Sequence, residues 1–137
     1  MREPVAYFDH DADMGIVGRG ALIEEAFENA ASAVFAMMTD LDQVRPHTSV
    51  AIDFEEADPE FALVTWLNLL LGQARSRALI FGRFHLRRDG AHWNGTAEGE
   101  PWRAGVERGV EVKGATLTAL AVTERDGIWD ARCVVDV

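Results

Sequence analysis

The sequence predicts an α+β fold in which two helices pack on a mostly antiparallel sheet. In the first half of the chain, apolar residues recur at three- and four-residue spacing in two long stretches, which is typical of helices. From residue 79 onward apolar and polar residues alternate, and the pairs Asp89-Gly90 and Asp126-Gly127 supply two hairpin turns. Strands joined by tight hairpins pair antiparallel, so helices and sheet are expected to form separate layers.

The size of the chain favours one domain spanning residues 1–137. A domain of this size buries about 68–70% of its unfolded surface and needs no disulfide to fold. The single cysteine, Cys133, excludes an intramolecular disulfide. No apolar run approaches the roughly 20 residues of a membrane helix, and residues 1–4 do not resemble the start of a signal peptide. We therefore expect a cytoplasmic protein with no membrane partner.

The formal net charge of −10 bears on the choice of partners. Such a surface repels a phosphate backbone at long range, so tight direct binding of RNA or DNA is not expected. Lys113 is the only lysine among 13 basic residues, which makes its position worth following.

The first elements are two short strands and a helix. Residues 5–8 and 14–20 are predicted strands on either side of an acidic stretch, and glycines weaken the second. Residues 21–38 form the clearest helix. Its apolar stripe consists of Leu22, Ala26, Ala30, Ala33, Val34 and Met37.

The middle of the chain adds a strand and a second helix. Residues 46–54 alternate apolar and polar side chains, as a half-buried strand does. Asp58 is a good N-cap and Pro59 suits the first turn of a helix that stays apolar until Gln73. Asn68 lies in the middle of this helix, where we expect a buried, hydrogen-bonded amide rather than a site residue.

The second half is predicted to consist of hairpins. The expected strands are residues 81–87, 91–98, 110–113, 117–124 and 128–135, of which the third and fourth could be one bent strand. Residues 99–101 (Gly-Glu-Pro) are expected to end the sheet locally, and a loop is expected at 102–109. Cys133 falls on the apolar face of the last strand and is expected to be an inert core thiol.

The stretch Asp9-His10-Asp11-Ala12-Asp13 is the strongest indication of a functional site. It places three carboxylates within five residues, and like charges at close range raise one another's pKa unless a cation lies among them. Carboxylate oxygens are hard ligands, so the cation would be Ca²⁺ or Mg²⁺. A solvated acidic loop between two strands explains the same residues and remains open.

A second acidic position lies near the other end of the sequence. If the first and last strands are neighbours, Asp136 and the carboxylate or carbonyl of Val137 can converge on Asp13 and hold one hard cation. His10 is expected to orient a carboxylate by a hydrogen bond, and Asp11 either joins the site or adds to its negative field.

Other kinds of chemistry find little support. The glycines match neither a Walker nor a dinucleotide-binding motif, no serine lies in a nucleophile motif, and one cysteine cannot build a thiolate zinc site. Lys113 is a lone lysine between two apolar strands and could contact a phosphate or carboxylate, or be a solvated residue at a sheet edge.

Several motifs, in unbroken order along the chain, resemble the archease family. Residues 9–16 are similar to that family's opening Asp-His-Thr-Ala-Asp-Val-Gly-Ile. Further matching segments are residues 23–31, 38–40, 66–70, 81–84, 99–101, 111–116 and 134–137. Asp11 replaces the usual threonine, and Thr118 stands where the family often has histidine, so a role of that histidine is not carried over.

The resemblance implies an accessory protein of the GTP-dependent RNA ligase that acts in tRNA splicing and RNA repair. Members of the family promote guanylylation of the ligase's active-site histidine and thereby multiple turnover. It implies a divalent ion, Ca²⁺ in the first instance and Mg²⁺ as the alternative, on Asp13, Asp136 and Val137. Ligase activation is assigned to four residues of the matching motifs: His10, Asp11, Lys113 and Thr116.

The acidic surface fits this interpretation, since it suits docking onto a basic ligase and contact with RNA only through that ligase. The interpretation makes the chain an activator and not an enzyme. Two alternatives use the same acidic cluster: a small metal-dependent hydrolase and a chaperone-like module. The second would require a large exposed apolar patch.

Overall fold

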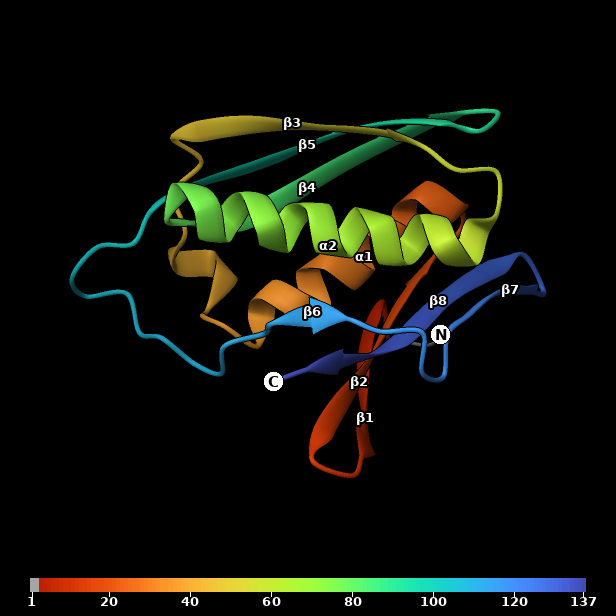
Figure 1. The fold of residues 1–137 in the computed structure, drawn as a ribbon, viewed down its shortest axis with the longest axis horizontal. Helices are drawn as coiled ribbons and strands as arrows, with labels where there is room; N and C mark the ends of the chain where they lie inside the picture. The colour runs from red at the N-terminus through yellow and green to blue at the C-terminus, as the bar shows by residue number, and fades with distance from the viewer. Residues whose placement is uncertain (1–2) are drawn as a thin grey trace.

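Two antiparallel sheets enclose two helices in the computed structural model, which describes residues 3–137 (Figure 1). Residues 1–2, part of the N-terminal stretch considered above, lie outside the described residues. The elements are β1 (Val5–His10), β2 (Asp13–Gly20), α1 (Ile23–Ala36), the 3-10 helix η1 (Leu41–Gln43), β3 (Thr48–Glu55), α2 (Pro59–Arg77), β4 (Leu79–Asp89), β5 (His92–Pro101), β6 (Gly114–Ala115), β7 (Ala121–Arg125) and β8 (Ile128–Asp136).

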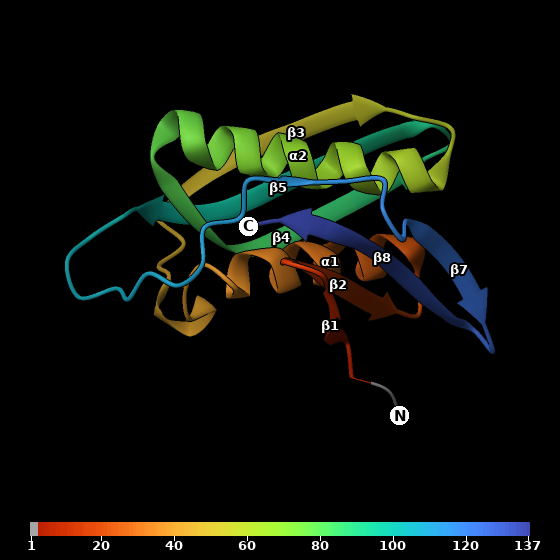
Figure 2. The same ribbon diagram turned by 60° about the horizontal axis from the view of Figure 1, so that its bottom comes forward.

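The larger sheet has the strand order β1-β2-β8-β6, and β7 also pairs with β8. The smaller sheet has the order β3-β5-β4. The helices lie between the two sheets, as Figures 1 and 2 show. Helix α1 contacts β2 and β8 of one sheet and β4 of the other, and α2 reaches both sheets in the same way. The predicted α+β class is confirmed, with the strands divided between two sheets. No helix among residues 3–137 is long and apolar enough to cross a membrane.

Helix α1 packs very closely on β2 because of a glycine. A Cβ atom at Gly18 would lie 2.2 Å from both the carbonyl oxygen of Ala26 and the backbone nitrogen of Ala30. Small residues on both surfaces therefore let the helix backbone rest directly on the strand. Helix α2 begins as predicted, since the Asp58 carboxylate accepts a hydrogen bond from the N–H of Glu60 at 2.8 Å.

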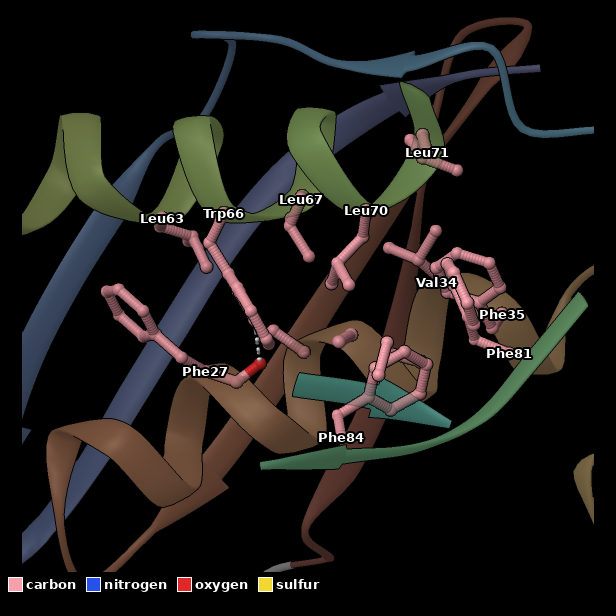
Figure 3. Packing of buried hydrophobic residues seen from close by; sticks show 14 of the residues in the cluster. Phe27, Val34, Phe35, Leu63, Trp66, Leu67, Leu70, Leu71, Phe81 and Phe84 are labelled. Carbon is pink, nitrogen blue, oxygen red and sulfur yellow. Dashed lines mark hydrogen bonds between the residues drawn. The ribbon is translucent and has the colours of Figure 1, made fainter. Parts of the chain in front are cut away.

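The core is built where the helices meet the smaller sheet (Figure 3). Trp66 of α2 is fully buried, and its indole N–H donates to the carbonyl of Phe27 in α1 at 3.0 Å. The ring of Phe27 stacks on Trp93 of β5 with centroids 5.0 Å apart. Phe35 packs on Phe81 and Phe84 of β4. The helices and the smaller sheet thus share one aromatic core, which fixes α2 relative to α1.

Three predictions for the second half were wrong in whole or in part. Strand β5 continues through residues 99–101 to Pro101, which pairs with Leu79 at the strand end, where a missing N–H is tolerated. Residues 110–113 form no strand. The N–H groups of Gly109 and Val110 instead donate to the carbonyls of Met38 and Met37 at the end of α1, at 2.7 and 2.8 Å. These bonds hold the start of the segment against the end of α1, and Lys113, the last residue of the segment, donates its N–H to the Asp136 carbonyl of β8.

The first half of the predicted strand 117–124 is irregular. Residues 117–120 form a turn with the Leu120 N–H directed to the Leu117 carbonyl at 3.3 Å, and Ala119 adopts a positive φ of 54°. Regular pairing begins only at Ala121, in β7. The other predicted strands and both helices lie where the sequence placed them, apart from small shifts at their ends.

Candidate functional site

The acidic residues of the two ends of the sequence meet at one end of the larger sheet. His10 pairs with Asp13 in the β1–β2 hairpin. In the next ladder Met14 pairs with Val135. Because the strands are antiparallel, the residue before Met14, Asp13, lies beside the residue after Val135, Asp136. Side chains alternate between faces along a strand, and neighbouring positions in a row share a face. The two carboxylates therefore project from the same face.

The row continues into β6 and is tied together by hydrogen bonds. Asp136 pairs with Gly114 of β6, so the row crosses four strands. The N–H of Val137 donates to Oδ1 of Asp13 at 3.4 Å, and the N–H of Lys113 donates to the Asp136 carbonyl at 2.8 Å. We call His10, Asp13, Asp136 and Gly114 the acidic row. Lys113 and Val137 lie next to it.

The hairpin tip carries the remaining acid of the predicted cluster. Asp11 has a positive φ of 52°, which a short polar residue tolerates in a turn. Its side chain is 94% exposed, and its Oδ2 lies 3.9 Å from Nδ1 of His10. At that distance the two groups can form an ion pair but no hydrogen bond. The structure therefore brings His10 near the exposed carboxylate of Asp11 as well as placing it in the row with Asp13.

Thr116 has a structural function that the sequence did not suggest. Its hydroxyl and its N–H both donate to the carbonyl of Val134, at 2.8 and 3.0 Å, and its hydroxyl accepts from the N–H of Thr118 at 3.2 Å. The Thr118 carbonyl in turn accepts from Val134. Both threonines hold the turn after β6 against β8, two residues from Asp136.

The donor chemistry of the acidic row fits a hard cation. Among residues 3–137, no three side chains of His, Cys, Asp or Glu are grouped as metal ligands. An ion at this position would be held by the carboxylates of Asp13 and Asp136 and an oxygen of Val137, all of the type that Ca²⁺ and Mg²⁺ prefer. The hydrogen bond from Val137 to Asp13 already orders two of these three residues.

Two residues of α2 contact the segment that carries Lys113. The Asn68 side chain forms two hydrogen bonds with the backbone of Ala115, and the Arg75 guanidinium donates to the Lys113 carbonyl. Asn68 is exposed rather than buried as predicted, although its amide is hydrogen-bonded as expected. The sequence did not indicate Arg75, because a single arginine on an exposed helix face carries no pattern.

A separate pocket of about 440 Å³ lies between the end of α2 and the segment after β5. Arg75 and Trp102 line it, and the Arg108 guanidinium lies over the Trp102 ring at 4.1 Å from its centroid. None of the residues predicted for the metal or for activation lines this pocket. The acidic row is therefore separate from this pocket, with Asp136 exposed and His10, Asp13 and Gly114 half-buried.

Comparison with known proteins gives consistent matches over nearly the whole chain. The model of the archease protein family (MTH1598/TM1083) matches residues 6–137. Protein archease of Sulfolobus acidocaldarius is 37% identical over 134 residues, which cover 96% of each chain. That of Methanothermobacter thermautotrophicus is 35% identical over 135 residues, again 96% of each.

Comparison with solved structures gives the same result as comparison with these sequences. The solution structure of Methanobacterium thermoautotrophicum protein 1598 superposes with a TM-score of 0.87 at 33% identity, covering 98% of this chain and 99% of that one. The crystal structure of a Thermotoga maritima archease, described as a possible chaperone, has a TM-score of 0.67 at 20% identity, with 100% and 98% covered, and supports the fold. From the family match over residues 6–137 and the relatives that align end to end, we conclude that this chain belongs to the archease family.

Proposed function

We propose that this chain is an accessory protein of a GTP-dependent RNA ligase and has no catalytic activity of its own. It would bind the ligase and promote transfer of GMP from GTP to the ligase's active-site histidine. Membership of the archease family supports the proposal. The observation that carries it is the acidic row, with Lys113 hydrogen-bonded through its backbone to Asp136.

The chemistry of guanylylation explains why such a site would help. A bond forms between a histidine nitrogen and the α-phosphorus of GTP while pyrophosphate leaves, and negative charge on the phosphate oxygens must be stabilised. A divalent ion on Asp13, Asp136 and Val137 would supply positive charge beside those oxygens. The Lys113 side chain is exposed and carries the only lysine ammonium of the chain, so it can reach a phosphate or an acidic group of the ligase.

The partner is proposed from charge as well. With a net charge of −10, the chain is suited to a basic protein surface and poorly suited to RNA itself. Contact with RNA would then be indirect, through the ligase. His10 and Asp11, at the tip of the β1–β2 hairpin, and Thr116, which holds the turn after β6, border the surface that would face the ligase.

The test is a ligase assay with the activator as the variable. Ligase is kept far below the RNA concentration, and labelled GTP reports the guanylylated ligase while product RNA reports turnover. We expect the wild-type chain to raise both signals and Asp13→Asn and Lys113→Ala to lose most of the increase. Asp53→Asn, an exposed aspartate on β3 of the other sheet, is the matched control and should behave as wild type.

The same assay separates the alternatives. A metal-dependent hydrolase would consume a substrate without ligase, and a chaperone-like module would raise the yield of folded ligase without changing guanylylation of ligase that is already folded. No effect of the wild-type chain on guanylylation or turnover refutes the proposal.

A further inference from the structure

Strand β6, which follows Lys113, is a very short element between two irregular segments. It has two residues, and the chain is irregular at 102–113 before it and at 116–120 after it. Its ladder with β8 pairs Gly114 with Asp136 and Ala115 with Val135, and the N–H groups of Lys113 and Thr116 on either side donate to carbonyls of β8. Fixing the backbone of one residue costs about 1–2 kcal/mol of conformational entropy. A strand of two residues therefore needs further contacts to hold one position.

Helix α2 provides these contacts on the edge of β6 that faces away from β8. The Asn68 amide nitrogen donates to the carbonyl of Ala115 at 3.2 Å, and its Oδ1 accepts from the N–H of the same residue at 2.8 Å. One side chain thus offers the donor and acceptor that a neighbouring strand would offer. Two turns further along α2, Nη2 of Arg75 donates to the Lys113 carbonyl at 3.0 Å. Figure 1 shows α2 running alongside β6.

The residues on both sides of Lys113 are adapted to this arrangement. A Cβ atom at Gly114 would lie 3.3 Å from Oδ1 of Asn68, so the glycine leaves room for the amide to approach. The N–H of Lys113 is bonded to the carbonyl of Asp136 at 2.8 Å, while its own carbonyl is bonded to Arg75. The Lys113 backbone is therefore held from the acidic row on one side and from α2 on the other.

We propose that Asn68 and Arg75 are positioning residues for ligase activation. Their hydrogen bonds go to the backbone of Ala115 and Lys113, and not to the side chains of Asp13 or Asp136. They act through the backbone of residues 113–115 and fix where Lys113 stands relative to Asp13 and Asp136, so that the lysine is preorganised when the ligase docks. This inference rests on the proposed function and adds two residues to it. We call the two side chains and the backbone they hold the Lys113 clamp.

The first experiment measures activation and local opening in the same variants. Asn68→Ala and Arg75→Ala are compared with Arg77→Ala, which removes the same charge from the same end of α2. We expect the two clamp variants to lower the guanylylation rate of the complex by about 2- to 10-fold, as loss of one or two hydrogen bonds permits. The Arg77→Ala variant should match wild type. Amide hydrogen exchange at Ala115 should be faster in Asn68→Ala.

A double-mutant cycle distinguishes positioning from general damage to the fold. If Asn68 acts through Lys113, Asn68→Ala should have almost no further effect on guanylylation in a Lys113→Ala background. Arg75→Lys, which keeps a donor at this position, should recover part of the rate lost in Arg75→Ala.

Three results would overturn the clamp. The first is an equal loss of activation from Asn68→Ala in both backgrounds, which indicates a purely structural role. The second is wild-type activation by the clamp variants. The third is exchange at Ala115 that does not change in Asn68→Ala. By contrast, a wild-type chain that activates no ligase refutes the proposed function itself, and the exchange measurement still reports whether the clamp holds the segment.

Discussion

Asp13 combines a place in the sheet with a place in the proposed metal site, which makes it the most informative residue to change. In Asp13→Asn the side chain keeps its size and an oxygen that can accept from Val137, while the charge is lost. An ion that binds only the folded state stabilises it by mass action. We expect Ca²⁺ to raise the melting temperature of wild type and of Asp53→Asn, and to raise that of Asp13→Asn much less. Chelator-stripped wild type that responds to neither millimolar Ca²⁺ nor Mg²⁺ would make the acidic row a docking surface only.

The reactivity of Cys133 tests whether the inner face of the larger sheet is buried. The side chain is fully buried in β8, and burial raises the pKa of its thiol to about 12. Since the thiolate is the reactive form, the native protein should resist alkylation at pH 8, whereas the denatured protein should react quickly. Mass spectrometry after brief exposure to iodoacetamide, with and without denaturant, measures both. Rapid labelling of the native protein would contradict the burial of this thiol.

Two glycines in different elements should respond in opposite ways to the same substitution. In Gly18→Ala the new methyl group would meet the backbone of α1 at 2.2 Å, so the helix and β2 must separate and stability should fall by about 1–3 kcal/mol or more. Gly72, within α2, has open space around it. Gly72→Ala should raise stability by about 0.5–1 kcal/mol, because alanine favours the helix. Urea unfolding of both variants measures the difference, and similar effects would contradict the close packing at Gly18.

The elements that the sequence predicted well are those whose pattern is local. The Asp58 cap, the periodicity of α1 and the Asp-Gly turns each depend on residues a few positions apart. Residues 110–113 were misassigned because an apolar–polar alternation indicates burial of alternate side chains and does not say where the backbone hydrogen bonds go. In the structure Val112 is buried, as the alternation predicts, but the preceding N–H groups bond to α1.

The candidate site depends on contacts between residues that are far apart in sequence. The sequence supplied Asp13, Asp136 and Lys113 through their motifs, and the β2–β8 pairing brings the two aspartates side by side. Asn68 and Arg75 could not be assigned to the site from sequence alone, because their contacts with residues 113–115 depend on how α2 crosses the sheet.

Across the whole molecule, Glu100 connects segments that are far apart in sequence. Its carboxylate is 4% exposed and accepts from the N–H of Arg45 at 2.7 Å and from Nε of Arg103 at 3.1 Å. The bond from the Arg45 backbone, helped by Arg103, holds the pKa of Glu100 below its ordinary value of 4.5 despite burial. The carboxylate therefore contributes stability above pH 4.5, and the contribution is lost as the pH falls through the lowered pKa.

This dependence on pH predicts that the difference in unfolding free energy between wild type and Glu100→Gln changes with pH. Glu100→Gln should be less stable than wild type at pH 7, and the gap in unfolding free energy should narrow as the pH is lowered below 4.5. Glu124→Gln, which changes an exposed residue of β7, is the control and should be as stable as wild type at each pH. Denaturant unfolding at a series of pH values gives the comparison. A gap that is constant with pH would exclude the ionised carboxylate as its cause.

The charge of the whole molecule predicts how its binding to the proposed ligase partner would depend on salt. With a net charge of −10, association with a basic ligase should weaken as salt rises, since charge interactions are screened over about 8–10 Å at moderate ionic strength. Calorimetry across a salt series measures this, and the chain should show negligible affinity for free RNA under the same conditions. Submicromolar binding to tRNA halves without ligase would contradict an indirect contact with RNA.

The central position of β8 has a consequence for how the protein is made. This strand lies between β2 and β6 and also pairs with β7, yet it is the last of the described strands to be synthesised. On the ribosome, β2 must wait with an unpaired edge while more than 100 residues follow it. Pairings of such long sequence separation form slowly. The larger sheet, and the acidic row with it, should therefore be completed only after residue 136 has been synthesised, whereas the β4–β5 hairpin can form earlier, while β8 is still missing.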